Sequence, residues 1–165
     1  MNTTKIGTEF EDKVYDYFKS LLNEDQLPFA PQKHSKIFKH KKYKCSSYSR
    51  EIDFDITIET YNPQIQSNSW SSLVVIECKN LTRIVDISDF DEMRRKLTDI
   101  SEYGVKGIMV TTNGFSRNGI EGAQKMHISL VVLSNNNSQW IVARNTNTKS
   151  EKIMPLLWFY VDLSG

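Results

Sequence analysis

The pattern of apolar and polar positions changes its period along the chain, and each change marks an expected element. Near the N-terminus, apolar residues recur every three or four positions, which predicts an amphipathic helix over residues 4–23. Its apolar stripe consists of Phe10, Val14, Tyr17, Phe18, Leu21 and Leu22. Strict alternation predicts a half-buried strand over residues 51–59, and an apolar run predicts another strand over residues 73–79.

The second half of the chain alternates between helical and strand patterns. Ser88 can cap a helix that extends to about residue 103, and a further helix is expected over residues 116–126. The inner face of the first of these helices consists of Phe90, Met93, Leu97 and Ile100. Near-continuous apolar runs predict strands over residues 105–112 and 128–134 that are covered on both faces.

One weaker strand is expected around residues 36–39, and an Asn-rich turn is expected to lead into residues 139–143. The order αβββαβαβ predicts an α/β fold with a mixed central sheet and helices on both faces. A chain of 165 residues can bury one core but not two, so a single domain is expected over residues 1–165. Its core covers about residues 4–134, and an extension over residues 135–165 has an apolar stretch, 153–163, that is expected to pack on the body.

Composition and charge narrow the functional classes. The chain has 21 Lys and Arg against 20 Asp and Glu, so a nucleic-acid partner must be met by a local patch rather than by the whole surface. No apolar stretch approaches the ~20 residues that a membrane span needs, and the acidic N-terminal helix does not resemble a secretory signal. Two cysteines are too few for a disulfide framework, so a cytoplasmic location is expected.

The strand over residues 73–79 ends in charged residues that can carry chemistry. Glu77 and Lys79 are two positions apart and therefore share one face of the strand. The preceding strand is expected to place three acids on one face and its apolar residues on the other: Glu51, Asp53 and Asp55 against Ile52, Phe54, Ile56 and Ile58. If the strands pair as a hairpin, carboxylates gather beside Glu77, and such hard oxygen ligands favour Mg²⁺. The alternative is an ordinary exposed sheet face with a cross-strand Glu–Lys pair.

Glu11 is the other unusual acid. At about 100° per residue it falls within the apolar stripe of the first helix, between Phe18 and Leu22, whereas Glu9 and Asp12 lie on the opposite side. A carboxylate on a buried face needs a partner because desolvating it alone is costly. Glu11 is therefore expected to join the other carboxylates, to pair with a core lysine, or to lie at the edge of the stripe.

Taken in chain order, these residues resemble the PD-(D/E)XK nuclease superfamily. The matching segments are Gly7-Thr8-Glu9-Phe10-Glu11, Ile52-Asp53, Glu77-Cys78-Lys79, residues 107–116, Ala123 and residues 128–130. The resemblance is closest to the Mrr-like restriction endonucleases and more distant to the archaeal Holliday-junction resolvases, and it covers about residues 7–133. Ile52 stands where the name-giving motif has Pro.

The resemblance implies a role for each of these residues. Asp53 and Glu77, with the backbone carbonyl of Cys78, would bind Mg²⁺, for which Mn²⁺ could substitute. Lys79 would position or activate the attacking water, and Glu11 would hold a second ion or an ordered water. Asp55 is the second choice for the metal position, because the family pattern selects Asp53. The resemblance also implies the core order αβββαβ, and it leaves target choice open, since Mrr-like enzymes usually have a separate DNA-reading domain.

A basic segment precedes the alternating strand. Its lysines are interleaved with aromatic residues and histidines: Lys33, Lys36, Lys39, Lys41, Lys42 and Lys44. Basic and aromatic residues together suit phosphate neutralisation and stacking on an exposed base, so this segment is expected to contact DNA. The alternative is a solvated edge strand guarded by lysines. Arg94, Arg95 and Lys96 are weaker candidates for DNA contact.

Other kinds of site are not expected. His34, His40 and His127 lack the spacing of a zinc site, and no Gly-rich phosphate loop indicates a nucleotide cofactor. The sequence therefore predicts a Mg²⁺-dependent endodeoxyribonuclease of the restriction, junction or repair type that hydrolyses phosphodiester bonds. The alternative is a nuclease-fold nucleic-acid-binding subunit that depends on partner chains or lacks turnover. Both functions are compatible with a homodimer or with a separate specificity or effector subunit. No residue of the sequence excludes RNA as the substrate.

Overall fold

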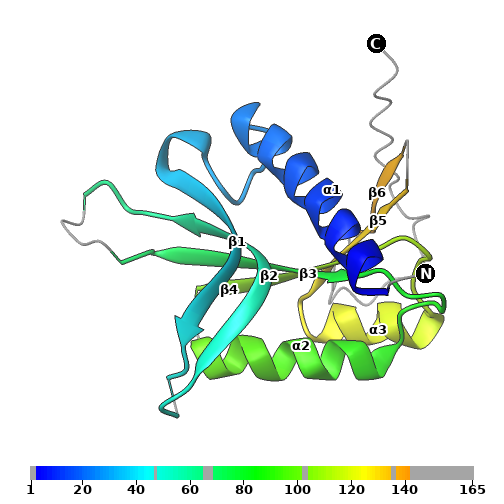
Figure 1. Ribbon diagram of the computed structural model, residues 1–165. Helices are drawn as coiled ribbons and strands as arrows, with labels where there is room; N and C mark the ends of the chain where they lie inside the picture. The colour runs from blue at the N-terminus through cyan, green and yellow to red at the C-terminus, as the bar shows by residue number, and fades with distance from the viewer. Residues whose placement is uncertain (1–2, 47, 65–68, 102–103, 135–136, 142–165) are drawn as a thin grey trace, which may run out of the picture.

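The elements of the chain follow the predicted order, with one further strand at the end (Figure 1). The computed structural model describes residues 3–46, 48–64, 69–101, 104–134 and 137–141. Its elements are α1 (Thr3–Asn23), the 3₁₀ turn Gln32–His34, β1 (Ser35–Lys44), β2 (Glu51–Thr60), β3 (Ser72–Lys79), α2 (Ile87–Ile100), β4 (Val105–Thr111), α3 (Arg117–Lys125), β5 (Ser129–Leu133) and β6 (Ser138–Ile141). The apolar stretch 153–163, predicted to pack on the body, lies outside the described residues.

One mixed sheet of six strands, in the order β1-β2-β3-β4-β5-β6, forms the centre of the fold. The first three strands are antiparallel neighbours, β3, β4 and β5 are parallel, and β6 returns antiparallel to β5. Parallel neighbours need a crossover connection, which α2 and α3 provide. Figure 1 shows α1 on one face of the sheet and α2 and α3 on the other. The predicted α/β fold with a mixed sheet and helices on both faces is confirmed.

The sheet separates two apolar cores. On one face, the α1 stripe packs against the sheet through four buried residues: Phe10, Val14, Phe18 and Leu22. On the other face, α2 and α3 cover the second core. β4 contributes to both, with Ile108 on the α1 side and Met109 on the α2 side, as the continuous apolar run predicts. Within the described ranges, no helix combines the length and apolar character needed to cross a membrane.

β2 changes the face that its apolar residues occupy. Ile52 and Phe54 pack in the core beneath α2 and α3, whereas Ile56 and Ile58 pack in the core beneath α1. All four have even numbers, so a regular strand would place them on one face. The prediction that they share a face is therefore wrong, because the strand turns over at Asp55.

β1, the partner of β2, also presents its apolar residues to one face before the bend and to the other face after it. Ile37 packs on the α1 side and Tyr43 on the α2 side, and His40 between them has a positive φ of 48°. Lys39 pairs with Ile56 and Lys41 pairs with Phe54, so the bend falls on the two residues between these pairs. This bend decides which acids of β2 approach the end of β3.

The start of α2 differs from the prediction by two residues. The N-cap is Asp86 rather than Ser88, and the helix begins at Ile87. The backbone amide of Asp86 donates to Asp89 Oδ2 at 3.0 Å, and Ser116, the N-cap of α3, donates its hydroxyl to Asp86 Oδ1 at 2.5 Å. Asp86 therefore joins the N-termini of α2 and α3, a contact that spacing along one helix does not reveal. The helix ends at Ile100, because Ser101 has an extended backbone.

Candidate active site

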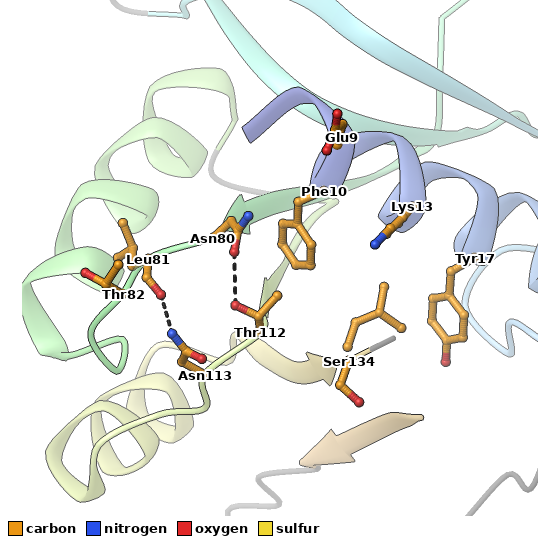
Figure 2. A pocket seen from close by; sticks show the side chains of 11 residues that line it. Glu9, Phe10, Lys13, Tyr17, Asn80, Leu81, Thr82, Thr112, Asn113 and Ser134 are labelled. Atoms are coloured by element: carbon orange, nitrogen blue, oxygen red, sulfur yellow. Dashed lines mark hydrogen bonds between the residues drawn. The ribbon is translucent and has the colours of Figure 1, made fainter. Parts of the chain in front are cut away.

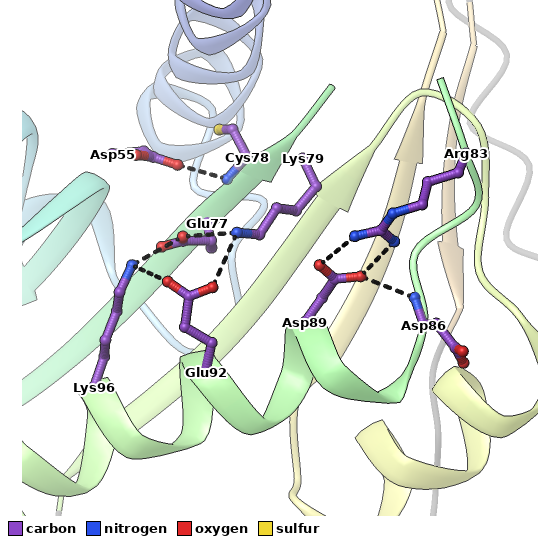
Figure 3. A network of polar contacts seen from close by, with 9 residues as sticks. All are labelled: Asp55, Glu77, Cys78, Lys79, Arg83, Asp86, Asp89, Glu92 and Lys96. Atoms are coloured by element: carbon purple, nitrogen blue, oxygen red, sulfur yellow. Dashed lines mark hydrogen bonds and ion pairs between the residues drawn. The ribbon is translucent and has the colours of Figure 1, made fainter. Parts of the chain in front are cut away.

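Glu77 and Lys79 lie at the end of β3 and share the face that α2 covers, as their spacing predicts (Figure 3). Glu77 is buried, and the side chain of Lys79 is 17% exposed. The Lys79 ammonium donates to Glu77 Oε1 across 3.3 Å. The end of a central strand thus holds a buried carboxylate and a lysine in contact with each other.

Helix α2 adds a second lysine and a second carboxylate to this pair. Lys96 Nζ lies 3.1 Å from Glu77 Oε1, the same oxygen that Lys79 contacts. Glu92 lies between the lysines, with Oε1 3.5 Å from Lys96 Nζ and Oε2 3.8 Å from Lys79 Nζ. Sequence reasoning assigned Glu92 no role and considered Lys96 only for DNA contact. Their i, i+4 spacing on a helix that follows the Glu77 strand was the available signal.

Asp55 is the acid of β2 that approaches Glu77. Backbone pairing of β2 with β3 runs from Thr60 opposite Ser72 to Ile56 opposite Ile76, and Asp55 comes just beyond the last pair. Its Oδ2 accepts a hydrogen bond from the backbone amide of Cys78 at 2.8 Å. Burial, and then the charge of Glu77, raise the pKa of the Asp55 carboxyl to about 6. The carboxylates of Asp55 and Glu77 therefore lie close enough at the end of β3 for their negative charges to repel each other.

Asp53 does not lie beside Glu77 at the end of β3. It is exposed and lies opposite Lys42 in the pairing of β1 with β2, and Glu51 is exposed as well. The bend at Asp55 is the reason, because it separates the acids that simple alternation would keep on one face. The geometry favours Asp55 over Asp53, the reverse of the order that the resemblance suggests.

Glu11 lies at the edge of the α1 stripe, near both His40 and Asp55. Its Oε2 is 3.3 Å from His40 Nε2, and its side chain is 21% exposed. Its negative charge is among the causes that raise the pKa of Asp55, after burial and Glu77. Asp12, the next residue, pairs instead with Lys39. Glu11 is the α1 acid that faces the bend and the other carboxylates.

The carboxylates at the end of β3 are candidate ligands of a divalent cation. Within the part of the chain that the structure describes, no group of three or more His, Cys, Asp or Glu residues could enclose a metal ion. Mg²⁺, however, is commonly bound through one or two carboxylates, with water and substrate phosphate as its other ligands. Glu77 Oε2 is buried and has no hydrogen-bond partner among the described residues, and Asp55 has a raised pKa. An unsatisfied acceptor beside a second carboxylate fits a hard cation.

The basic segment covers the 3₁₀ turn, which holds Lys33, and β1, the edge strand of the sheet. The structure divides its lysines into two groups. Lys39 and Lys41 are partly buried and form ion pairs, Lys39 with Asp12 and Lys41 with Glu59. The remaining lysines of the segment are exposed: Lys33, Lys36, Lys42 and Lys44. These four exposed lysines are the ones whose charges are available to a partner in solution.

A buried polar network around Glu59 explains why Lys41 turns inward. Glu59 is 2% exposed, and it accepts hydrogen bonds from the hydroxyls of Tyr43, at 2.6 Å, and Tyr61. Lys41 Nζ lies 2.6 Å from Glu59 Oε1. Burial raises the pKa of Glu59, but its hydrogen bonds, first that from Lys41, outweigh burial and lower the pKa overall. Sequence reasoning missed this network, because Glu59 occupied an ordinary polar position in the alternating pattern.

A cleft of about 610 Å³ lies near the end of β3, and none of Glu77, Lys79, Asp55 and Glu11 lines it (Figure 2). It lies where β3, β4 and β5 end, beside α1, and ligands of open α/β sheets bind at such strand ends. Its lining includes Phe10 and Tyr17 of α1. Thr112 donates to Asn80 Oδ1 at 3.1 Å, and the Asn113 side-chain amide donates to the backbone carbonyl of Leu81. Asn80 directly follows Lys79, so the cleft begins one residue beyond the charged pair.

Comparisons with known proteins yield distant structural likenesses. No family model and no curated protein matches the chain. Among solved structures, protein AF1548, of unknown function, has a TM-score of 0.48 and 16% identity, with 68% of this chain and 53% of that chain covered. A repair endonuclease from Pyrococcus abyssi has a TM-score of 0.45 and 17% identity, with 71% of this chain and 45% of that chain covered. The chain thus spans about half of each, and neither likeness carries a conclusion about its chemistry.

Proposed function

We propose that this protein is a Mg²⁺-dependent DNA endonuclease that hydrolyses phosphodiester bonds. The observation that carries the proposal is the contact between Glu77, buried and with one unsatisfied oxygen, and Lys79, at the end of a central strand beside Asp55. An acid, a second acid and a lysine in this order on two antiparallel strands match the PD-(D/E)XK pattern. The merely structural alternative, an exposed sheet face, does not account for the burial of Glu77.

Each group of the site has a task in this reaction. Asp55 and Glu77 would hold Mg²⁺, with Mn²⁺ as a substitute, and Glu11 would act through a second ion or an ordered water. When bound, the ion polarises a phosphoryl oxygen and lowers the pKa of a bound water. Lys79 can orient the attacking water and offset the negative charge that develops on the phosphate, because its ammonium lies against the ligand carboxylate.

DNA would approach along the exposed lysines of β1 and of the 3₁₀ turn before it. Lys33, Lys36, Lys42 and Lys44 present positive charge at the edge of the sheet, and contacts of this kind neutralise backbone phosphates without reading sequence. Lys39 and Lys41 already have carboxylate partners, so their contribution to binding is smaller.

The decisive experiment is cleavage of plasmid, single-stranded and branched DNA by the purified chain, with Mg²⁺, with Mn²⁺ or with EDTA. Cleavage that requires the metal and disappears in Glu77→Gln is expected. Glu51→Gln is the matched control, since it removes an exposed carboxylate from β2. Cleavage that survives in EDTA, or in purified Glu77→Gln, would contradict the proposal.

A nuclease-fold DNA-binding subunit without turnover is the second candidate. In its favour, Lys79 and Lys96 both contact Glu77 Oε1, so the carboxylate has counter-ions without a metal. This candidate predicts salt-dependent DNA binding with no cleavage under any metal condition, and binding that is unchanged in Glu77→Gln. The same set of assays therefore separates the two functions.

A further inference from the structure

The two oxygens of Glu77 have unequal surroundings. Oε1 has two ammonium groups near it, Lys79 at 3.3 Å from its own strand and Lys96 at 3.1 Å from α2 (Figure 3). Oε2 is buried and has no hydrogen-bond partner among the residues described. One ammonium balances the charge of one carboxylate, so Oε1 has one more cation near it than Glu77 alone requires.

Helix α2 holds Lys96 between two carboxylates, Glu77 and Glu92. The Lys96 side chain is 28% exposed, and Glu92, one turn earlier, lies 3.5 Å from its ammonium. Glu77 and Glu92 thus balance Lys79 and Lys96, and all four side chains form one neutral set.

We propose that Lys96 is a positioning residue that occupies Glu77 when no metal is bound and so sets the Mg²⁺ concentration at which the site fills. This inference rests on the proposed function. A cation that binds Glu77 competes with an ammonium at the same carboxylate, and binding of one weakens binding of the other. When Mg²⁺ displaces the Lys96 ammonium from Glu77, Glu92 can serve as its partner, because Glu92 already lies 3.5 Å from that ammonium.

The same arrangement gives Lys96 and Lys79 different tasks. Lys79 follows Glu77 by two residues on the same strand face, so the strand itself keeps the two side chains neighbours. Lys96 reaches the carboxylate from another element through a long, flexible side chain, and it can exchange Glu77 for Glu92 without movement of the backbone.

The test is calorimetric titration of the full chain with Mg²⁺, without DNA and at fixed pH and salt. Lys96→Met keeps the aliphatic stem and removes the charge, and it is expected to tighten Mg²⁺ binding by about 10-fold, a modest effect for a charge beside the ligand. Lys96→Arg keeps the charge and is expected to bind as wild type does. Lys96→Gln repeats the test if the Met variant folds poorly. Arg95→Met is the matched control, since Arg95 is the exposed preceding residue.

Glu77→Gln separates failure of this inference from failure of the proposed function. If Glu77→Gln loses Mg²⁺ binding but Lys96→Met binds no more tightly than wild type, Lys96 does not compete and the inference is overturned while the nuclease site stands. If Glu77→Gln binds Mg²⁺ as wild type does, the metal is not held at Glu77 and both are overturned. Tighter binding in Lys96→Met and Lys96→Gln, but not in Lys96→Arg or Arg95→Met, supports the inference.

Discussion

The Asp55 carboxylate accepts a hydrogen bond from the backbone amide of Cys78 at 2.8 Å, and this contact holds the acid beside Glu77. It forms where β2 turns away from β3, so a side chain replaces the backbone carbonyl that would continue the strand pairing. A hydrogen bond to an ionised acceptor is stronger than one between neutral groups. The contact therefore positions a carboxylate in spite of its repulsion by Glu77.

Asp55→Asn is expected to slow cleavage by about 10²-fold or more, the scale of losing one group that stabilises the transition state. The amide keeps the volume of the side chain and can accept the Cys78 hydrogen bond, so the fold should remain. Asp53→Asn should have a much smaller effect, because Asp53 is exposed. Cleavage rates of the two purified variants, compared under one metal condition, decide between them. Loss of activity in Asp53→Asn alone would return the metal position to Asp53.

Lys79→Ala is expected to separate metal binding from hydrolysis. Mg²⁺ should still bind, since both carboxylates remain, and DNA affinity should fall only modestly. The rate of hydrolysis should fall by about 10²-fold or more, because one donor to the developing charge is lost. Single-turnover cleavage and an independent DNA-binding assay measure the two effects. Equal losses in both assays would indicate a binding role for Lys79.

The exposed lysines of β1 should determine the salt dependence of DNA binding. Replacing Lys36, Lys42 and Lys44 by Gln is expected to weaken affinity and flatten the plot of log affinity against log salt, by about 0.9 for each lost phosphate contact on duplex DNA. Lys125→Gln, on α3, is the control and should leave the slope unchanged. An unaltered slope in the triple variant would identify β1 as an ordinary solvated edge.

The Glu59 network should give the protein part of its stability in a defined pH range. The folded-state pKa of Glu59 is below its ordinary value, so its contribution is present above the unfolded pKa and is lost as pH falls through the folded pKa. Glu59→Gln is expected to lower the free energy of unfolding at pH 7 by about 1–3 kcal/mol, through the buried partners it leaves less well satisfied. Denaturant unfolding between pH 3 and pH 7 should show a shallower acid limb in the variant than in wild type.

Glu11→Gln tests whether the α1 acid belongs to the site. Removing its charge relieves repulsion around Asp55, so the melting temperature in metal-free buffer should stay equal or rise. The stabilisation that added Mg²⁺ provides by binding the native state should shrink, and cleavage should slow. Glu9→Gln, two positions away and exposed, is the control. Identical behaviour of the two variants would exclude Glu11 from the site.

The order of the elements up to β5 and the shared face of Glu77 and Lys79 could be predicted from the pattern of residues alone. Both follow from periods within single elements, 3.6 residues for a helix and two for a strand, which hold wherever backbone geometry is regular. The two-sided apolar strands β4 and β5 were predictable for the same reason, since a buried parallel strand needs apolar residues on both faces.

Which residues complete the site depends on how the elements pack against one another. Alternation placed Asp53 and Asp55 together, but the bend of the β1–β2 hairpin brings Asp55 to Glu77 and leaves Asp53 in solvent. Lys96 reaches Glu77 because α2 packs over β3, and Lys41 turns inward because Glu59 is buried beside it. These contacts join segments far apart in the chain, and they depend on packing and strand twist rather than on the period of any one element.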